Sequence, residues 1–249
     1  MRYKVITAVR NCPEHLDRCL QVLSEQQGEY DVCVVDDAST DHTPEVAREW
    51  CRKQGWEFIG QSEWKGALYN QVEAINLICD DDDDVIVFCD GDDRLAHDRV
   101  FPTLDRRYAD GTKLTYGSYR SDPYDPNCPM PFPFPDDVIR ENRYRKFILP
   151  VSLGGESGGH AFNHLRTFKY ELFRQLEEAD FLDDDGEWFK NTPDTVLMVP
   201  CMELARGAIK CLRDVLLIYT SDMPHAEWRT IGKKIDKVNL TVLQRPAKC

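Results

Sequence analysis

Two groups of aspartates stand directly after apolar, strand-like runs, and these are the residues best suited to chemistry. The pair Asp36-Asp37 follows the run at 30–35, and the turn Asp90–Asp93 follows the run at 85–89. In an open parallel sheet, ligands bind outside the carboxyl ends of the strands, so both groups are expected at one crevice. Clustered carboxylates offer the hard oxygen ligands that Mg2+ and Mn2+ prefer, and such an ion neutralises phosphate charge. The sequence therefore predicts a phosphate-handling site built around a dication.

Two common phosphate-binding loops are absent from the sequence. No G-x-G-x-x-G follows the first strand-like run, and no G-x-x-x-x-G-K-[ST] occurs anywhere. A dinucleotide-binding Rossmann site and a P-loop therefore lose support. The run Asp80–Asp84 is also acidic, but it precedes a strand instead of following one, so we interpret it as a solvated turn.

The first hundred residues alternate short apolar runs with helical patterns, which is typical of a parallel, doubly wound sheet. Pro13 can open a helix, and Leu16, Leu20 and Leu23 recur after it at helical spacing. The predicted strands cover 4–9, 30–35, 56–60 and 85–89, and the predicted helices cover 13–27, 44–54 and 67–78. This order places the ends of the strands with their aspartates at one edge of the sheet.

The second half is less regular. Strands are predicted at 108–119 and 213–219, and helices at 167–179 and 194–205. Six of the 14 prolines lie between Pro123 and Pro135, which predicts a loop over the body of the protein. The stretch Gly154–Gly159 is expected to be irregular as well.

Composition excludes several classes of protein. The chain has 249 residues, 42% of them apolar, so it can bury the core of one large domain and is not a disordered polyanion. Its 31 Lys and Arg against 44 Asp and Glu give a net charge of -13, which disfavours a protein that coats nucleic acid. One local basic patch is the exception, made by Arg140, Arg143, Arg145 and Lys146.

The cellular compartment is predicted from the length of the apolar runs, the amino-terminal segment and the pattern of cysteines. No apolar run approaches the roughly 18 to 20 residues of a membrane span, and the amino terminus runs into a strand instead of a signal peptide. The ten cysteines form no C-x-x-C pair, and Cys33 and Cys89 interrupt apolar runs, as free buried thiols do. These features predict a reducing, cytoplasmic location.

Val34–Asp41 (VVDDASTD) and Phe88–Asp93 (FCDGDD) together resemble the family-2 glycosyltransferases of the GT-A fold. Thr7–Asn11 resembles the opening strand of that family, and Gly66 and Asn70 resemble its positions before the fourth strand. The resemblance spans roughly residues 3–220 and is strongest over the first hundred. It implies an α/β fold, a single Rossmann-like GT-A domain with a mostly parallel central sheet flanked by helices.

The resemblance also implies an activity: a metal-dependent, inverting transfer of a hexosyl or pentosyl group from a nucleoside-diphosphate sugar, of the UDP type, to an acceptor hydroxyl. Residues 1–105 would form the nucleotide-sugar half, 106–225 the acceptor half of the same domain, and 226–249 a C-terminal tail. The acceptor stays open among a glycan, a lipid-linked molecule, a protein and a nucleic-acid base.

Carried over residue by residue, the resemblance assigns Asp37 to the nucleobase and Asp90 and Asp92 to a DxD pair, with Asp93 in support. The cofactor would be Mn2+ or Mg2+. The implied nucleotide-sugar residues are Ala8, Asp36, Asp37, Gly66, Asp90 and Gly91, and the implied metal ligands are Asp90, Asp92 and His225.

A general base must activate the acceptor hydroxyl, and the resemblance points to Asp194 at the start of a helix. Pro193 departs from the acidic residue that the family places before its base, so Asp185 and Glu187 remain rivals, and Asp194 could instead only cap the helix. Trp188 could be a sugar-stacking platform or a core residue.

Two other functions remain open at this point. A nucleotidyltransferase can share the Rossmann-like core, but it carries a glycine-rich loop after the first strand, which residues 8–13 do not match. A nucleotide-sugar-binding module with weak or lost catalysis would keep the same acidic residues, and an activity assay would separate it from an enzyme.

Overall fold

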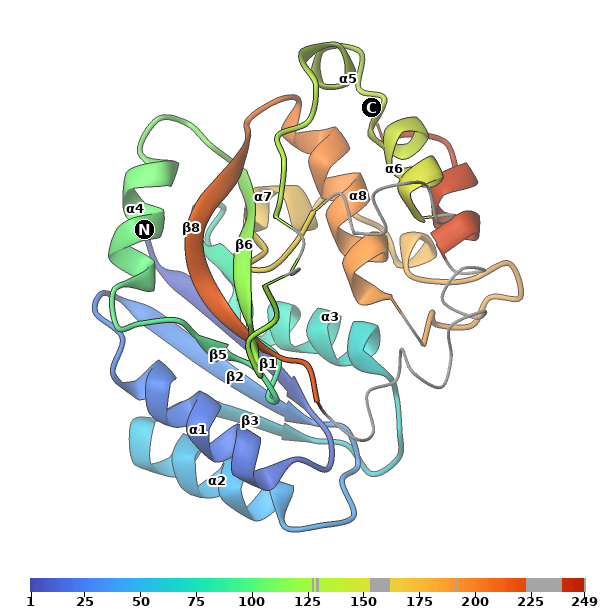
Figure 1. The fold of residues 1–249 in the computed structure, drawn as a ribbon. Helices are drawn as coiled ribbons and strands as arrows, with labels where there is room; N and C mark the ends of the chain where they lie inside the picture. The colour runs from blue at the N-terminus through green and yellow to red at the C-terminus, as the bar shows by residue number, and fades with distance from the viewer. Residues whose placement is uncertain (127, 129, 153–161, 191, 223–238, 249) are drawn as a thin grey trace.

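A computed structural model describes residues 1–126, 128, 130–152, 162–190, 192–222 and 239–248 (Figure 1). In these residues, eight strands form one sheet in the order β3-β2-β1-β4-β7-β6-β8-β5. The strands are β1 (Tyr3–Val9), β2 (Tyr30–Asp36), β3 (Glu57–Gly60), β4 (Val85–Phe88), β5 (Arg94–Leu95), β6 (Leu114–Asp122), β7 (Thr167–Lys169) and β8 (Ile209–Thr220). The helices are α1 (Pro13–Ser24), α2 (Thr43–Gln54), α3 (Ala67–Ile78), α4 (Val100–Tyr108), α5 (Asp136–Arg140), α6 (Tyr144–Ser152), α7 (Tyr170–Phe173) and α8 (Pro193–Ala205), with a 3-10 turn η1 (Glu178–Asp180).

The first half has the parallel order that the sequence predicts. β1 pairs in parallel with β2 and with β4, and β2 pairs in parallel with β3. β1, β4 and most of β2 are buried on both faces, in keeping with their largely apolar sequences, whereas β3 is partly exposed. One buried cluster joins Val5 and Val34 to α1, α2 and α4, and a second joins Ile6 and Val35 to α3 and α8. Figure 1 shows α1 and α2 on one side of the sheet and α3 on the other.

The second half corrects several predictions. The predicted strand at 108–119 begins too early, because Tyr108 ends helix α4, and β6 starts only at Leu114. The predicted helix at 167–179 is wrong: its first three residues form β7, followed by the short helix α7 and the turn η1. Helix α8 and a strand around 213–219 are confirmed, and between Pro123 and Pro135 the described residues form neither helix nor strand. The stretch 154–159 lies outside the described residues.

β7 joins the two halves of the sheet. It pairs antiparallel with β4 on one side and with β6 on the other, while β6 and β8 are parallel. The sheet is thus parallel in its first half and mixed in its second. Among the described residues, no helix combines the length and the apolar character needed to span a bilayer.

The predicted basic patch is largely neutralised within the fold. Arg143 forms ion pairs with Asp137 (2.6 Å) and Glu141 (2.7 Å). Arg145 is buried and pairs with Glu203 of α8, whose side chain is 0% exposed. These two guanidinium groups therefore hold α5, α6 and α8 together, whereas the other two members of the patch, Arg140 and Lys146, are exposed.

Glu203 also binds the end of the chain. Its Oε2 accepts hydrogen bonds from Arg145 Nη2 (2.9 Å) and from the backbone N–H of Lys248 (2.9 Å). Val242 and Leu243, in a helical turn of residues 239–244, are buried beside α6 and α8 (Figure 1). The described part of the predicted tail thus packs on the domain.

Glu203→Ala is expected to lower the free energy of unfolding by about 3–5 kcal/mol, because it leaves the buried Arg145 charge without its partner. Glu171→Ala is the matched control. Glu171 pairs with Lys113 at 2.9 Å, but both side chains are partly exposed, so we expect a loss of at most about 1 kcal/mol. Urea denaturation measures both values, and similar losses would contradict the structural role of Glu203.

Candidate functional site

The carboxyl end of β1 brings the two aspartate motifs together. The carbonyl of Ala8 accepts a hydrogen bond from the N–H of Gly91 (2.9 Å), and the carbonyl of Val9 accepts one from the N–H of Asp37 (2.9 Å). β1 lies between β2 and β4, so the segments that follow those two strands meet across its end. Both motifs therefore occupy one edge of the sheet.

Gly91 lies where a side chain has no room. A Cβ atom at this position would be 2.7 Å from both Cβ and Cγ2 of Val9, and 3.3 Å from Cδ1 of Leu16. The close approach of this turn to β1 therefore requires glycine.

Gly91→Ala is expected to destabilise the protein by about 1–3 kcal/mol through overpacking against Val9. In the double variant with Val9→Ala, the loss of unfolding free energy should be smaller than the sum of the two single losses, because the contact is relieved. Urea denaturation of the three variants measures this coupling. Strictly additive losses would be inconsistent with the contact.

Asp37 connects the end of β2 to the loop before α3. Its Oδ1 accepts a hydrogen bond from the N–H of Lys65 (2.7 Å), and its Oδ2 accepts one from the N–H of Gly66 (3.0 Å). Gly66 has φ 90°, and a Cβ atom there would lie 3.1 Å from the carbonyl oxygen of Lys190. The structure thus joins Asp37 and Gly66 directly, as a buried carboxylate held by two backbone donors.

Asp36 points elsewhere. Side chains alternate along β2, so Asp36 lies on the same face as Val34, toward α1 and α2. Its Oδ2 accepts a hydrogen bond from Ser39 N–H (3.2 Å), whereas its buried Oδ1 has no partner among the described residues. Burial raises the pKa of this carboxyl. Of the six predicted nucleotide-sugar residues, Asp36 is the one that the structure does not bring to the others.

Three carboxyl groups are concentrated in the Asp90–Asp93 turn, where Asp93 is buried and Asp90 and Asp92 are partly buried. Burial raises the pKa of Asp92 to about 7, and the nearby Asp90 carboxylate adds to this shift. Burial raises the pKa of Asp90 as well, although Arg166 acts against it. A pair of carboxylates with raised pKa values is stabilised in its charged form by a cation between them.

The carboxylate of Asp93 connects the same turn to strand β8. Its Oδ1 accepts a hydrogen bond from the N–H of Thr220 (2.8 Å), and the hydroxyl of Thr220 donates one to the carbonyl of Asp92. The turn is therefore fastened to the end of β8.

Arg166 connects this turn to the predicted base. Its buried guanidinium forms an ion pair with Oδ1 of Asp194, in the first turn of α8, and donates a hydrogen bond to Nε2 of His164 (2.8 Å). Burial lowers the pKa of Arg166 to about 10, while Asp90 and Asp93 act to raise it. One buried cation thus lies in the field of both Asp90 and Asp194.

The rivals of Asp194 lie apart from Arg166. Asp185 and Glu187 are exposed in a turn, where their N–H groups bond to Oδ1 of Asp183 (2.9 and 3.0 Å). Contacts within the described chain link neither side chain to Arg166. His225 lies outside the described residues.

Two aromatic residues lie near Asp37 and Gly66. Trp64 is 38% exposed, and its ring is 5.9 Å from the guanidinium of Arg10 and 5.6 Å from Nζ of Lys190. Trp188 stacks on Phe181 with ring centroids 5.6 Å apart, so it is at least partly a core residue. Trp64 stands in an irregular stretch, and the sequence alone does not show that its ring is exposed.

Solved glycosyltransferases share this fold. TarS of S. aureus has a TM-score of 0.63 at 14% identity, and the match covers 99% of this chain but 41% of TarS. The mannosyltransferase PcManGT of Pyrobaculum calidifontis, in complex with GDP-Man and Mn2+, gives 0.60 at 17% identity, with coverage of 99% and 65%. Glucosyl-3-phosphoglycerate synthase of Mycobacterium tuberculosis, in complex with Mn2+, UDP and glucosyl-3-phosphoglycerate, gives 0.60 at 16% identity, with coverage of 99% and 81%. At these identities the likeness shows the fold alone.

The fold is therefore that of the GT-A glycosyltransferases, which confirms the predicted fold class. The sequence model described as "Glycosyl transferase family 2" matches residues 4–176, which is more than half of the chain. The protein thus belongs to glycosyltransferase family 2, the family that its sequence resembles. No curated protein matches the chain.

Proposed function

We propose that this protein is a metal-dependent, inverting glycosyltransferase that moves a sugar from a nucleoside-diphosphate sugar, of the UDP type, to an acceptor hydroxyl. The observation that carries the proposal is the partly buried Asp90–Asp93 turn at the end of β4, linked through Arg166 to Asp194. Solved structures of the same fold that hold UDP or GDP-Man with Mn2+ support it. The donor would bind along Ala8, Asp37, Gly66, Asp90 and Gly91, and Asp36 would act on this site only from the other face of β2.

The residues at the turn fit Mn2+ or Mg2+ by the chemistry of their oxygens. Asp90 and Asp92 bring two partly buried carboxylates, and a bound dication would lower the raised pKa values of both. In the part of the chain that the structure describes, no group of three or more His, Cys, Asp or Glu side chains is arranged to hold a metal. The two carboxylates would therefore share the ion with diphosphate oxygens and water, and His225 is the proposed third protein ligand. When bound, the dication stabilises the negative charge that develops on the departing diphosphate.

Asp194 is the proposed general base. Arg166 holds Oδ1 of its carboxylate, while Oδ2 accepts no hydrogen bond from a described residue and is free to take the acceptor proton. The ion pair also favours the charged form of Asp194, which a base requires. Inversion needs this proton transfer on the face of the sugar opposite the leaving diphosphate.

Nucleotide binding is tested by thermal denaturation with UDP, GDP, ADP, CDP and dTDP, each with and without Mn2+. A rise in Tm that needs both Mn2+ and UDP is expected, because a ligand that binds only the folded state stabilises it by about 2.7 kcal/mol at a hundredfold excess over Kd. Asp92→Asn should show no such rise. Equal denaturation curves under all conditions would contradict the proposal.

A cytoplasmic location belongs to the same proposal. Nine cysteines lie in the described residues; all are free thiols, and seven of them are buried. Buried free thiols of this kind are typical of proteins that work in a reducing compartment.

A further inference from the structure

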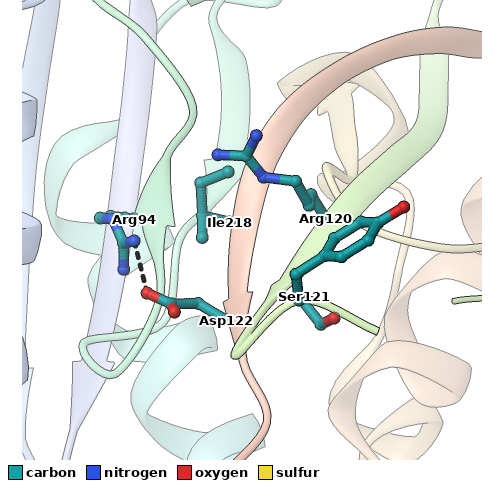
Figure 2. Close-up of a pocket in the computed structure, with 6 residues that line it drawn as sticks. Arg94, Arg120, Ser121, Asp122 and Ile218 are labelled. Carbon is teal, nitrogen blue, oxygen red and sulfur yellow. Dashed lines mark hydrogen bonds and ion pairs between the residues drawn. The ribbon is translucent and has the colours of Figure 1, made fainter. Parts of the chain in front are cut away.

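A polar pocket lies beside the Asp90–Asp93 turn, on the strands that follow it. The pocket has a volume of about 410 Å3 and is lined by Arg94, Arg120, Ser121, Asp122, Tyr124 and Ile218. Arg94 follows the aspartate turn directly and opens β5. Figure 2 shows Ile218 between Arg94 and Arg120, with Arg94 turned toward Asp122.

Strand register explains this arrangement. Ile218 of β8 pairs with Arg94 of β5 on one side and with Arg120 of β6 on the other. The three residues therefore form one row across three strands, and their side chains share a face of the sheet. Tyr119 and Tyr219, the neighbours of Arg120 and Ile218, point to the opposite face, where both pack against the ring of His164. The pocket is thus separated by the sheet from the side on which His164 contacts Arg166.

The pocket has more positive than negative charge. Arg94 pairs with Asp122 at 2.6 Å, and the fields of Arg18 and Arg120 also help to hold the pKa of Asp122 below its usual value. Neither Arg18 nor Arg120 forms an ion pair or a hydrogen bond with another described residue. Burial and the charge of Arg18 lower the pKa of His15 on α1, although Asp222 acts in the opposite direction. Arg94 and Arg120 share the lining of the pocket with one carboxylate, that of Asp122, so the lining has a net positive charge in a chain whose net charge is -13.

We propose that this pocket binds a phosphate group carried by the saccharide acceptor. Guanidinium groups match the geometry of phosphate oxygens, and Arg120 and Arg94 flank the space from two strands. Tyr124 is 71% exposed at the rim and offers a ring on which a sugar can stack. The assignment to the acceptor rests on the proposed function. Because the sheet separates the pocket from the side of Arg166, the acceptor must extend past the Asp90–Asp93 turn to bring its hydroxyl to Asp194.

The test is a titration of the whole protein with glucose 6-phosphate, inorganic phosphate and glucose, without nucleotide or metal, followed by the 15N–1H signals of the arginine side chains. Glucose 6-phosphate is expected to shift the signals of Arg94 and Arg120, and glucose is not. Arg120→Gln should weaken the Kd for glucose 6-phosphate about tenfold, since it removes one charge-assisted contact. Arg52→Gln, at an exposed arginine near the end of α2, is the control and should leave the Kd unchanged.

Several results would overturn the proposal. Equal Kd values for the wild type and for both Arg120→Gln and Arg18→Gln would exclude the pocket. Tighter binding of inorganic phosphate than of glucose 6-phosphate would identify a free-anion site and overturn the acceptor assignment. Phosphate binding that appears only when Mn2+ is added, and that is lost in Asp92→Asn, would place the anion at the donor site instead. Because no nucleotide is present, failure here is distinguishable from failure of the proposed donor site, which the nucleotide-dependent Tm reports.

Discussion

Asp92→Asn is expected to reduce sugar transfer at least about 10^3-fold, equivalent to about 4 kcal/mol of transition-state stabilisation. The amide keeps the size of the side chain but offers no charge to a dication. Because the neutral amide also removes repulsion with Asp90, the fold should be kept, and the Tm in the absence of metal should not fall. Turnover of the nucleotide sugar, measured by release of the nucleoside diphosphate in the presence of Mn2+, checks this.

Asp82→Asn is the matched control for this variant. Asp82 is an exposed aspartate whose partner is Arg174, at 2.7 Å, in the acidic run before β4. We expect turnover close to that of the wild type, since a surface ion pair contributes little. Near-normal turnover of Asp92→Asn would exclude a metal role for this carboxylate.

Asp194→Asn is expected to lower kcat by about 10^2- to 10^4-fold with little change in the KM for the donor, because the base acts on the acceptor. The ion pair with Arg166 would be lost, but the amide oxygen can still accept a hydrogen bond from it, so the start of α8 should stay in place. Steady-state kinetics with saturating acceptor measures the effect, and circular dichroism checks the fold.

Variants of the two rival residues, Asp185 and Glu187, are the controls for this experiment. Asp185→Asn and Glu187→Gln should keep kcat near the wild-type value, since both side chains are exposed in a turn away from Arg166. A large loss in either variant, with Asp194→Asn active, would transfer the role of base to the turn at 183–188.

The first half of the fold was predictable from sequence because its signals are local. Each strand from β1 to β4 is a short apolar run, and each intervening helix begins at a proline or after a glycine. The order of these elements then places Asp37 and Asp90 at one edge of the sheet without any knowledge of packing. The same reasoning predicted α8, whose first turn contains Pro193.

The second half of the fold was harder to predict because its structure depends on contacts between residues that are far apart in the sequence. β7 has only three residues, and its structure comes from pairing with β4 and β6, so its sequence alone resembled a helix. Arg166 stands beside this strand, and no local pattern distinguishes it from other arginines. Its importance comes from Asp194, 28 positions later, and from Asp90, 76 positions earlier, which only the folded chain brings near.

Ion pairs hold both ends of helix α8, and the helix thereby connects the proposed base to the last described residues of the chain. Asp194 in its first turn is held by Arg166, while Glu203 near its last turn is held by Arg145 and by the backbone of Lys248. The helix is therefore held by contacts at both ends, so its orientation determines the position of the Asp194 carboxylate. Residues 239–248 contact no substrate in this scheme, yet any change that loosens them would release one anchor and shift the proposed base.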